Sequence, residues 1–190
     1  MNEYENALLK DKRIGFGIYL GVEAIMFATL FTNYFIFTPS PQGPQPGEIF
    51  EAKSLILSSI FLLSSSFTLI AGEKWLKGKR NGFFLIAFGI TALFAMIFLG
   101  LEVKEFYKYL TEGNGMSANN FMASFYVLVG LHAAHVAFGI GWMASLLINW
   151  MRKIPQGLFN EKLKIFSYYW HFVDIIWVGI ILIVYLPYLI

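Results

Sequence analysis

The sequence predicts an all-α membrane protein, a five-transmembrane-helix bundle within a single domain over residues 1–190. Of the 190 residues, 57% are hydrophobic and 14% are charged, whereas about a quarter of a soluble domain is charged. The hydrophobic residues gather in five blocks, each long enough to cross a bilayer core of about 30 Å as a helix. No block alternates polar and apolar residues with period two, which excludes the strands of a membrane barrel.

Charged and turn-forming residues delimit the five blocks. The first block follows Arg13 and is too long for the core of a secretory signal, so we expect this helix to be retained. Proline and glycine in residues 38–53 predict an irregular loop. Four basic residues separate the second and third blocks, a further connection is expected over residues 102–120, and Arg152 and Lys164 delimit the last two blocks. The predicted helices cover residues 14–37, 54–72, 82–101, 121–150 and 165–190.

The basic residues predict how the chain is oriented. Eleven of the 14 Lys and Arg residues lie on the side of the N-terminus, and Lys53, Lys104 and Lys108 lie on the other side. Because cytoplasmic loops are enriched in Lys and Arg, we expect a cytoplasmic N-terminus and, after five crossings, a C-terminus outside. The chain has no cysteine, which excludes disulfides, thiolate-bound metals and cysteine nucleophiles.

Two predicted helices carry small residues at helical spacing. These two stripes are Gly17, Gly21, Ala24 and Ala28 in the first helix and Gly130, Ala134, Ala137 and Gly141 in the fourth. Small residues let helix backbones approach closely within a membrane. We therefore expect both stripes to be faces on which helices pack.

Five ionisable side chains lie inside the predicted spans, in a band from the bilayer centre to the cytoplasmic half. They are Glu23, His132, His135, His171 and Asp174. A charged side chain at the centre costs about 2.5–3.5 kcal/mol on insertion scales, so each should face protein, a partner or water. No Lys or Arg of the chain reaches the depth of Glu23, so we expect its carboxyl to hold a proton. Either it forms a hydrogen bond to a neighbouring helix, or it takes part in proton transfer.

His171 and Asp174 are three residues apart, which lets them meet or share a partner on one helix face. They either form a polar pair that locks helix packing or have a role with a lipid headgroup or a proton. Three histidines also raise the hypothesis of a metal or haem site. The Glu-x-x-His motif of di-iron bundles is absent and no second glutamate lies at the right depth, so we expect no metal.

Several segments resemble subunit III of the haem-copper terminal oxidases. Residues 21–35, GVEAIMFATLFTNYF, resemble the family's glutamate-containing helix, with Glu23 in the place of its buried glutamate. Residues 101–107, LEVKEFY, resemble a Gln-x-x-Glu-Tyr stretch, in which Glu105 matches the glutamate and Glu102 replaces the glutamine of mitochondrial members. Residues 64–73, SSSFTLIAGE, are more weakly similar to a serine-rich segment of the family.

The last two helices carry the most specific similarity. Residues 125–139, FYVLVGLHAAHVAFG, resemble the family's helix with a His-Gly-x-His core, although Val129 and Ala133 stand where threonine and glycine are usual. Residues 169–185, YWHFVDIIWVGIILIVY, resemble its closing Tyr-Trp-His-Phe-Val-Asp-Val-Val-Trp helix. The residues carried over are His132, His135, Trp170, His171, Asp174 and Trp177.

The resemblance implies the non-redox subunit III, in its bacterial five-helix form, of a respiratory oxidase that reduces O2 and translocates protons. Haem and copper then lie in partner subunits, with subunit I in direct contact and subunit II and small subunits in the same complex. A multi-pass location in a bacterial or archaeal cell (inner) membrane and bound phospholipid are also implied. Glu23 becomes the proton-linked candidate. The lipid-binding or structural polar candidates are Glu105, His132, His135, Trp170, His171, Asp174 and Trp177.

Alternative functions differ in electron donor or in class. Subunit III of cytochrome c oxidases and of quinol oxidases is alike, so the donor is left open. An accessory subunit of nitric oxide reductases is less favoured. So is a free-standing proton-coupled carrier using Glu23, His171 and Asp174, because the sequence has no repeated pair of broken helices such as many transporters use. We expect neither a catalytic residue in this chain nor a nucleic acid partner.

Overall fold

The computed structural model describes residues 3–39, 46–50 and 52–189, and every regular element in these ranges is helical. The prediction of an all-α chain is confirmed. Five segments are long and apolar enough to cross a membrane: Asp11–Phe37, Ala52–Lys77, Asn81–Thr111, Asn120–Met151 and Gln156–Tyr188. The elements are α1 (Glu3–Phe37), α2 (Pro46–Ile49), α3 (Ala52–Lys77), α4 (Asn81–Thr111), α5 (Asn120–Met151), α6 (Gln156–Ile180), the π-helical turn η1 (Ile181–Tyr185) and α7 (Leu186–Leu189).

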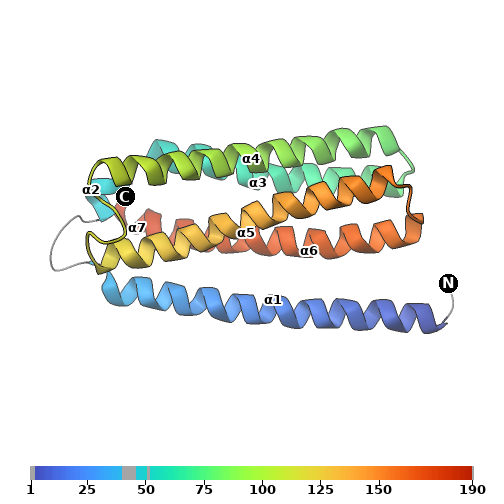
Figure 1. Ribbon diagram of the computed structural model, residues 1–190, viewed down its shortest axis with the longest axis horizontal. Coiled ribbons are helices and arrows are strands. Elements are labelled where there is room, and N and C mark those ends of the chain that lie inside the picture. Colours follow the sequence, from blue (N-terminus) through green and yellow to red (C-terminus); the bar gives the residue numbers. More distant parts are fainter. Residues whose placement is uncertain (1–2, 40–45, 51, 190) are drawn as a thin grey trace.

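The five long helices run alternately in opposite directions (Figure 1). α3 and α4 form the most extensive pair, α5 and α6 lie in the middle, and α1 contacts α5 and α6 at the edge. The start of α1 and the short helix α7 lie at opposite ends of the bundle, as an odd number of crossings requires. We call these the α3–α4 turn end and the α2/α7 end.

Aromatic side chains fill the centre of the bundle. Phe98 of α4 meets Trp177 of α6 edge to face, with ring centroids 4.9 Å apart, and both rings are fully buried. In the most apolar window of the last span 50% of the residues are buried, against 6% in α1. The last span is thus the axis of the bundle, and α1 is a peripheral helix with most of its surface open.

Four predicted boundaries were wrong, because the hydrophobic blocks end at the first charged residues while the helices continue. α1 begins at Glu3, eleven residues before the predicted start, and α3 ends at Lys77, five residues beyond the predicted end. α4 runs ten residues beyond the predicted end, through Glu102 and Glu105 to Thr111, so these carboxyls lie in a helix and not in a loop. α6 begins at Gln156, nine residues before the predicted start. Within the predicted loop 38–53, the stretch Pro46–Ile49 forms a helical turn, and residues 40–45 and 51 lie outside the described residues.

Most residues of the two small-residue stripes face away from the other helices of this chain, although a Cβ added at Gly130 of α5 would lie 3.6 Å from Phe106 of α4. All four stripe residues of α1 are exposed, and a Cβ added at Gly17 or Gly21 would meet no atom within 4 Å. In α5, Ala134, Ala137 and Gly141 are also exposed. These residues therefore face outward from the chain, and the prediction that helices pack on both stripes stays a prediction for partner helices.

Gly139 is the glycine at which two helices do come close. A Cβ added there would lie 2.9 Å from Cε3 of Trp170 and closer still to Cζ3. Both Gly139 and Trp170 are buried. The absence of a side chain on α5 therefore lets the largest side chain of α6 enter the helix interface.

Gly139→Ala should destabilise the subunit by about 1–3 kcal/mol, because an added methyl group in a packed core forces side chains and backbone to shift. Thermal unfolding of the purified protein complex in detergent measures the effect. Gly141→Ala is the matched control, since a Cβ there meets no atom within 4 Å. Equal melting temperatures for the two variants would contradict the assigned contact.

Candidate functional site: the buried polar groups

Serines of α3 face two tryptophans of α6. Nε1 of Trp170 donates a hydrogen bond to Oγ of Ser65 at 2.9 Å, and Nε1 of Trp177 donates to Oγ of Ser59 at 3.1 Å. Both indoles are fully buried, and a buried indole N–H normally finds an acceptor. The serine-rich segment 64–73 thus provides the partner of Trp170, and Ser59, which precedes that segment on α3, provides the partner of Trp177; the sequence similarity alone did not indicate either pairing.

Ser66 of α3 joins His171 and Asp174 of α6. Its Oγ lies 3.2 Å from Nδ1 of His171 and donates a short hydrogen bond to Oδ2 of Asp174. The prediction that His171 and Asp174 meet or share a partner is confirmed, and the shared partner is Ser66. Oδ1 of Asp174 has no hydrogen-bond partner among the described residues.

Glu23 of α1 meets His135 of α5. Oε2 of Glu23 lies 3.2 Å from Nε2 of His135, and their side chains are 16% and 13% exposed. The carbonyl oxygen of Leu131 lies 2.8 Å from Nδ1 of His135, and a carbonyl can only accept, so Nδ1 carries a hydrogen. The remaining acidic proton of the pair therefore lies between the carboxyl and Nε2. The sequence predicted that Glu23 and His135 lie in the same band of the membrane, but it did not predict that they contact each other.

His132 has surroundings unlike those of His135, although the two are three residues apart. It is fully buried. Its ring stacks on that of Trp177, with centroids 5.1 Å apart, and meets the ring of Phe98 edge to face, with centroids 5.9 Å apart. Neither ring nitrogen has a hydrogen-bond partner among the described residues. His132 thus packs as an aromatic ring in the core, in contact with Trp177.

Glu105 belongs to a polar cluster near the α2/α7 end. One carboxylate oxygen accepts a hydrogen bond from Oγ of Ser54 at 2.6 Å, and the other accepts one from the hydroxyl of Tyr109. One turn away, Glu102 is 2% exposed, and its Oε2 has no hydrogen-bond partner among the described residues. The sequence missed the burial of Glu102 because its hydrophobic block ended one residue earlier.

Two of the grooves at the α3–α4 turn end flank Tyr168 of α6. Arg13 of α1 forms an ion pair with Glu161 of α6, with Nη2 and Oε1 2.5 Å apart. One groove lies between α1 and α6, and its lining includes Arg13, Gly17 and His171. The other lies between α3 and α6, and its lining includes Lys77 and Lys164. Tyr168 borders both grooves, which makes them neighbours along α6.

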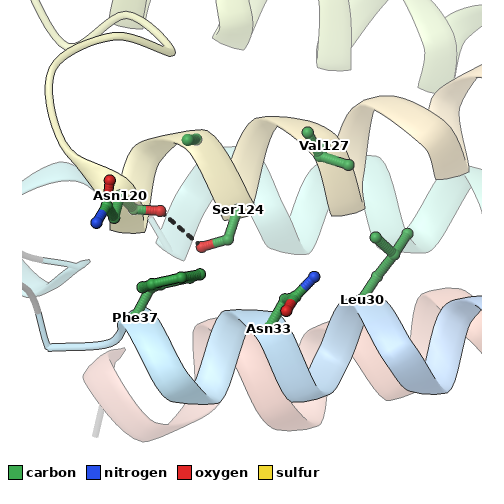
Figure 2. Close-up of a pocket in the computed structure, with 7 residues that line it drawn as sticks. Leu30, Asn33, Phe37, Asn120, Ser124 and Val127 are labelled. Carbon is green, nitrogen blue, oxygen red and sulfur yellow. Dashed lines mark hydrogen bonds between the residues drawn. The ribbon is translucent and has the colours of Figure 1, made fainter.

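A third groove lies between α1 and α5 near the α2/α7 end (Figure 2). Figure 2 shows the amide of Asn33 pointing from α1 toward α5, where Oγ of Ser124 donates to the carbonyl oxygen of Asn120 at 3.0 Å. No ionisable side chain lines this groove. It offers apolar surface and two amides but no acid–base chemistry.

Within the described ranges, no group of three or more His, Asp or Glu side chains is placed to hold a metal ion. The arrangement provides carboxyl groups and imidazoles paired across helices, with grooves at both ends of the bundle. The fold and these groups define a multi-pass helical membrane protein whose buried polar residues can hold protons and fix helix contacts.

Comparison with known proteins identifies the family. The family model described as cytochrome c oxidase subunit III matches residues 2–188. The chain is 38% identical over 179 residues to "Cytochrome c oxidase subunit 3" of Bacillus sp. (strain PS3), covering 93% of this chain and 86% of the relative. It is 36% identical over 186 residues to "Quinol oxidase subunit 3" of Bacillus subtilis (strain 168), covering 97% and 91%. The chain belongs to the cytochrome c oxidase subunit III family and is a subunit of a haem-copper terminal oxidase.

His132, His135 and His171 should bind no metal. The ring nitrogens of His132 have no polar partner among the described residues, His135 meets one carboxyl group and His171 meets a serine, so no set of ligands surrounds any of the three. Elemental analysis of the subunit separated from its complex should show no stoichiometric iron, copper or zinc. Its control is the intact complex, in which haem iron and copper should be present. A reproducible one-to-one metal in the separated subunit would contradict the assignment.

Proposed function

We propose that this chain is the non-redox subunit III of a bacterial cell-membrane oxidase, in direct contact with subunit I and supporting its O2 reduction and proton translocation. Subunit II and small subunits complete the complex, and the N-terminus faces the cytoplasm. The Glu23–His135 pair is the observation that carries this proposal. It is a carboxyl–imidazole pair between the peripheral helix α1 and α5, at a depth where an unpaired charge is costly.

The Glu23–His135 pair has the chemistry of a proton relay. Because Nδ1 of His135 donates to Leu131, the proton shared by Oε2 of Glu23 and Nε2 of His135 is the one that can leave. Imidazole titrates near neutral pH in water, which suits it to proton exchange. The low burial of α1 leaves this proton close to the surface that a partner subunit would cover. The pair supports proton supply to that partner.

Glu23→Gln should leave assembly and initial turnover largely unchanged but shorten the working life of the oxidase. Glutamine keeps the size and a hydrogen bond to His135 while it removes the titrating group. The measurement is O2 consumption by the purified complex followed until activity is lost, together with proton uptake. Glu73→Gln, a half-buried carboxyl of α3, is the matched control.

The Glu23→Gln variant also separates the two interpretations of this residue. If prolonged turnover matches that of the wild type, the carboxyl serves only as a packing hydrogen bond and the proton-linked role is wrong. His135→Asn should reproduce the shortened working life if the pair acts as a unit.

The outward stripe of α1 supports direct contact with subunit I. Gly17, Gly21, Ala24 and Ala28 are exposed in the chain alone, and small residues are where membrane helices approach most closely. We propose that a helix of subunit I packs there.

Curated relatives are named for both electron donors. One of them is "Cytochrome bo(3) ubiquinol oxidase subunit 3" of Pseudomonas aeruginosa, which is 33% identical over 178 residues, 90% of this chain and 83% of the relative. Cytochrome c and quinol both stay open for the partner enzyme.

The two neighbouring grooves at the α3–α4 turn end suit a phospholipid. Lys77 and Lys164 provide positive charge at the rim of one groove, and each basic residue near a membrane surface attracts anionic headgroups by about 1 kcal/mol. Phe172 and Ile175 provide an apolar wall in the other. Trp170 and Trp177 are buried against α3, so His171 and Tyr168, and not the tryptophans, form the lipid-facing edge.

Lys77→Gln with Lys164→Gln should reduce the phospholipid retained by the complex, because the headgroup loses its charged partners. Lipid phosphorus per haem after detergent purification measures the retention. The matched control is Lys53→Gln with Lys104→Gln at the opposite end of the bundle. Equal retention in both double variants would argue against a lipid site at these grooves.

A further inference from the structure

Glu102 and Glu105 are two buried carboxyl groups one helical turn apart on α4. Residues at this spacing have Cβ atoms about 5–6 Å apart on the same helix face. The carboxyls lie about 14 Å and 9 Å along the helix from its end at Thr111. Glu102 is 2% exposed and Glu105 is 8% exposed. Neither belongs to the Glu23–His135 pair, which lies between α1 and α5.

The surroundings of the two carboxyls are unequal. Both oxygens of Glu105 accept hydrogen bonds, one from Ser54 and one from Tyr109, and such bonds stabilise a carboxylate. Oε2 of Glu102 is buried without a hydrogen-bond partner among the described residues. Two carboxylates this close within a protein interior do not both ionise, so one of them keeps a proton.

We propose that Glu102 and Glu105 form a proton-binding site that holds one proton, on Glu102, and exchanges it with the aqueous phase at the α2/α7 end. With the orientation proposed above, that phase is the outer one. The ligand is a proton. Glu105 is the carboxylate of the pair and the group nearer to water.

The other titratable groups around the pair are consistent with one shared proton. Tyr185 of the π-helical turn η1 is buried and lies within electrostatic range of both carboxyls. Tyr109 donates to Glu105, and Tyr34 of α1 is bound to the carbonyl oxygen of Val184. His132 of α5 packs deeper, against Phe98 and Trp177. These neighbours are tyrosines and a buried imidazole. The nearby lysines lie at the surface opening of a groove between α3 and α4.

A groove between α3 and α4 connects the pair to the surface. Glu105, Ser54 and Tyr109 line it together with Leu57 and Leu101 on its apolar side. Glu102 does not line the groove, so Glu105 stands between Glu102 and water. The lysines at its mouth are Lys53, Lys104 and Lys108, the last 3.8 Å from Glu112. Their positive charge disfavours a metal cation and leaves a proton as the ligand.

Infrared spectroscopy of the purified complex tests where the proton is. The difference spectrum between the wild type and Glu102→Gln should contain the carbonyl band of a protonated carboxyl that shifts in D2O, and this band should still be present in Glu23→Gln. Glu105→Gln should keep the band at a shifted frequency, because Glu102 still holds the proton. A band that survives Glu102→Gln, or one that Glu105→Gln abolishes, would overturn the assignment. So would loss of the band on addition of Mg²⁺ or Zn²⁺ alone.

A second pair of variants tests the route. Leu57→Trp places a large ring in the groove and should slow the exchange of the Glu102 proton for deuterium at least several-fold. Ile56→Trp is the matched control, because Ile56 is exposed on the same helix but does not line the groove. Equal exchange rates in the two variants would overturn access through this groove. The outcome is independent of Glu23, so failure here leaves the proposed function of the Glu23–His135 pair untouched.

Discussion

The hydrogen bonds between the serines of α3 and the side chains of α6 set the register on which the rest of the bundle depends. Apolar side chains in a bilayer give helices little reason to prefer one another over lipid, so directional contacts and close packing decide the arrangement. Ser59 meets Trp177, and one to two turns further along α3 Ser65 and Ser66 meet Trp170 and Asp174, which lie earlier on α6, as in an antiparallel helix pair. A slip of one turn along α3 would leave two buried indole N–H groups and a carboxyl without partners, at a cost of about 1–3 kcal/mol each.

With α6 held in this register, the remaining polar groups are arranged around α6. Trp170 packs against Gly139 of α5. On the same helix, His135 contacts Glu23 of α1. Trp177 stacks on His132 and meets Phe98 of α4. The aromatic core is therefore the structural link between the polar groups at the two ends of the bundle. The acidic groups that could exchange protons lie on the margins of this core and not at its centre.

Hydropathy and helical spacing predicted much of the fold and one local site. Block length predicted five crossings, and the three-residue spacing predicted that His171 and Asp174 would share a partner. The pairing of Glu23 with His135 was not predicted, because depth says which residues share a layer but not which helices are neighbours. The stripe at Gly17 and Gly21 shows a related limit, since a small-residue face does not say whether the helix that packs on it belongs to this chain or to a partner.

The end of α4 shows a different limit of sequence reasoning. A hydrophobic block ends at its first charged residue, and Glu102 is that residue. Beyond this point Glu105 accepts a hydrogen bond from Tyr109, one turn further along the same helix, and one from Ser54 of α3, which the linear sequence does not reveal. Composition alone therefore stops the predicted helix short of a carboxyl that has partners within the fold.

The central claim is that this chain works as a haem-free subunit within a haem-bearing oxidase. The most direct measurement is the visible absorption spectrum and O2-reducing activity of the material purified through a tag on this chain in mild detergent. We expect a haem-copper complex that reduces O2 with either cytochrome c or a quinol, and a copper A signal would assign cytochrome c as the donor. Isolation of the chain without haem-bearing partners, from membranes that contain an active oxidase, would contradict the claim.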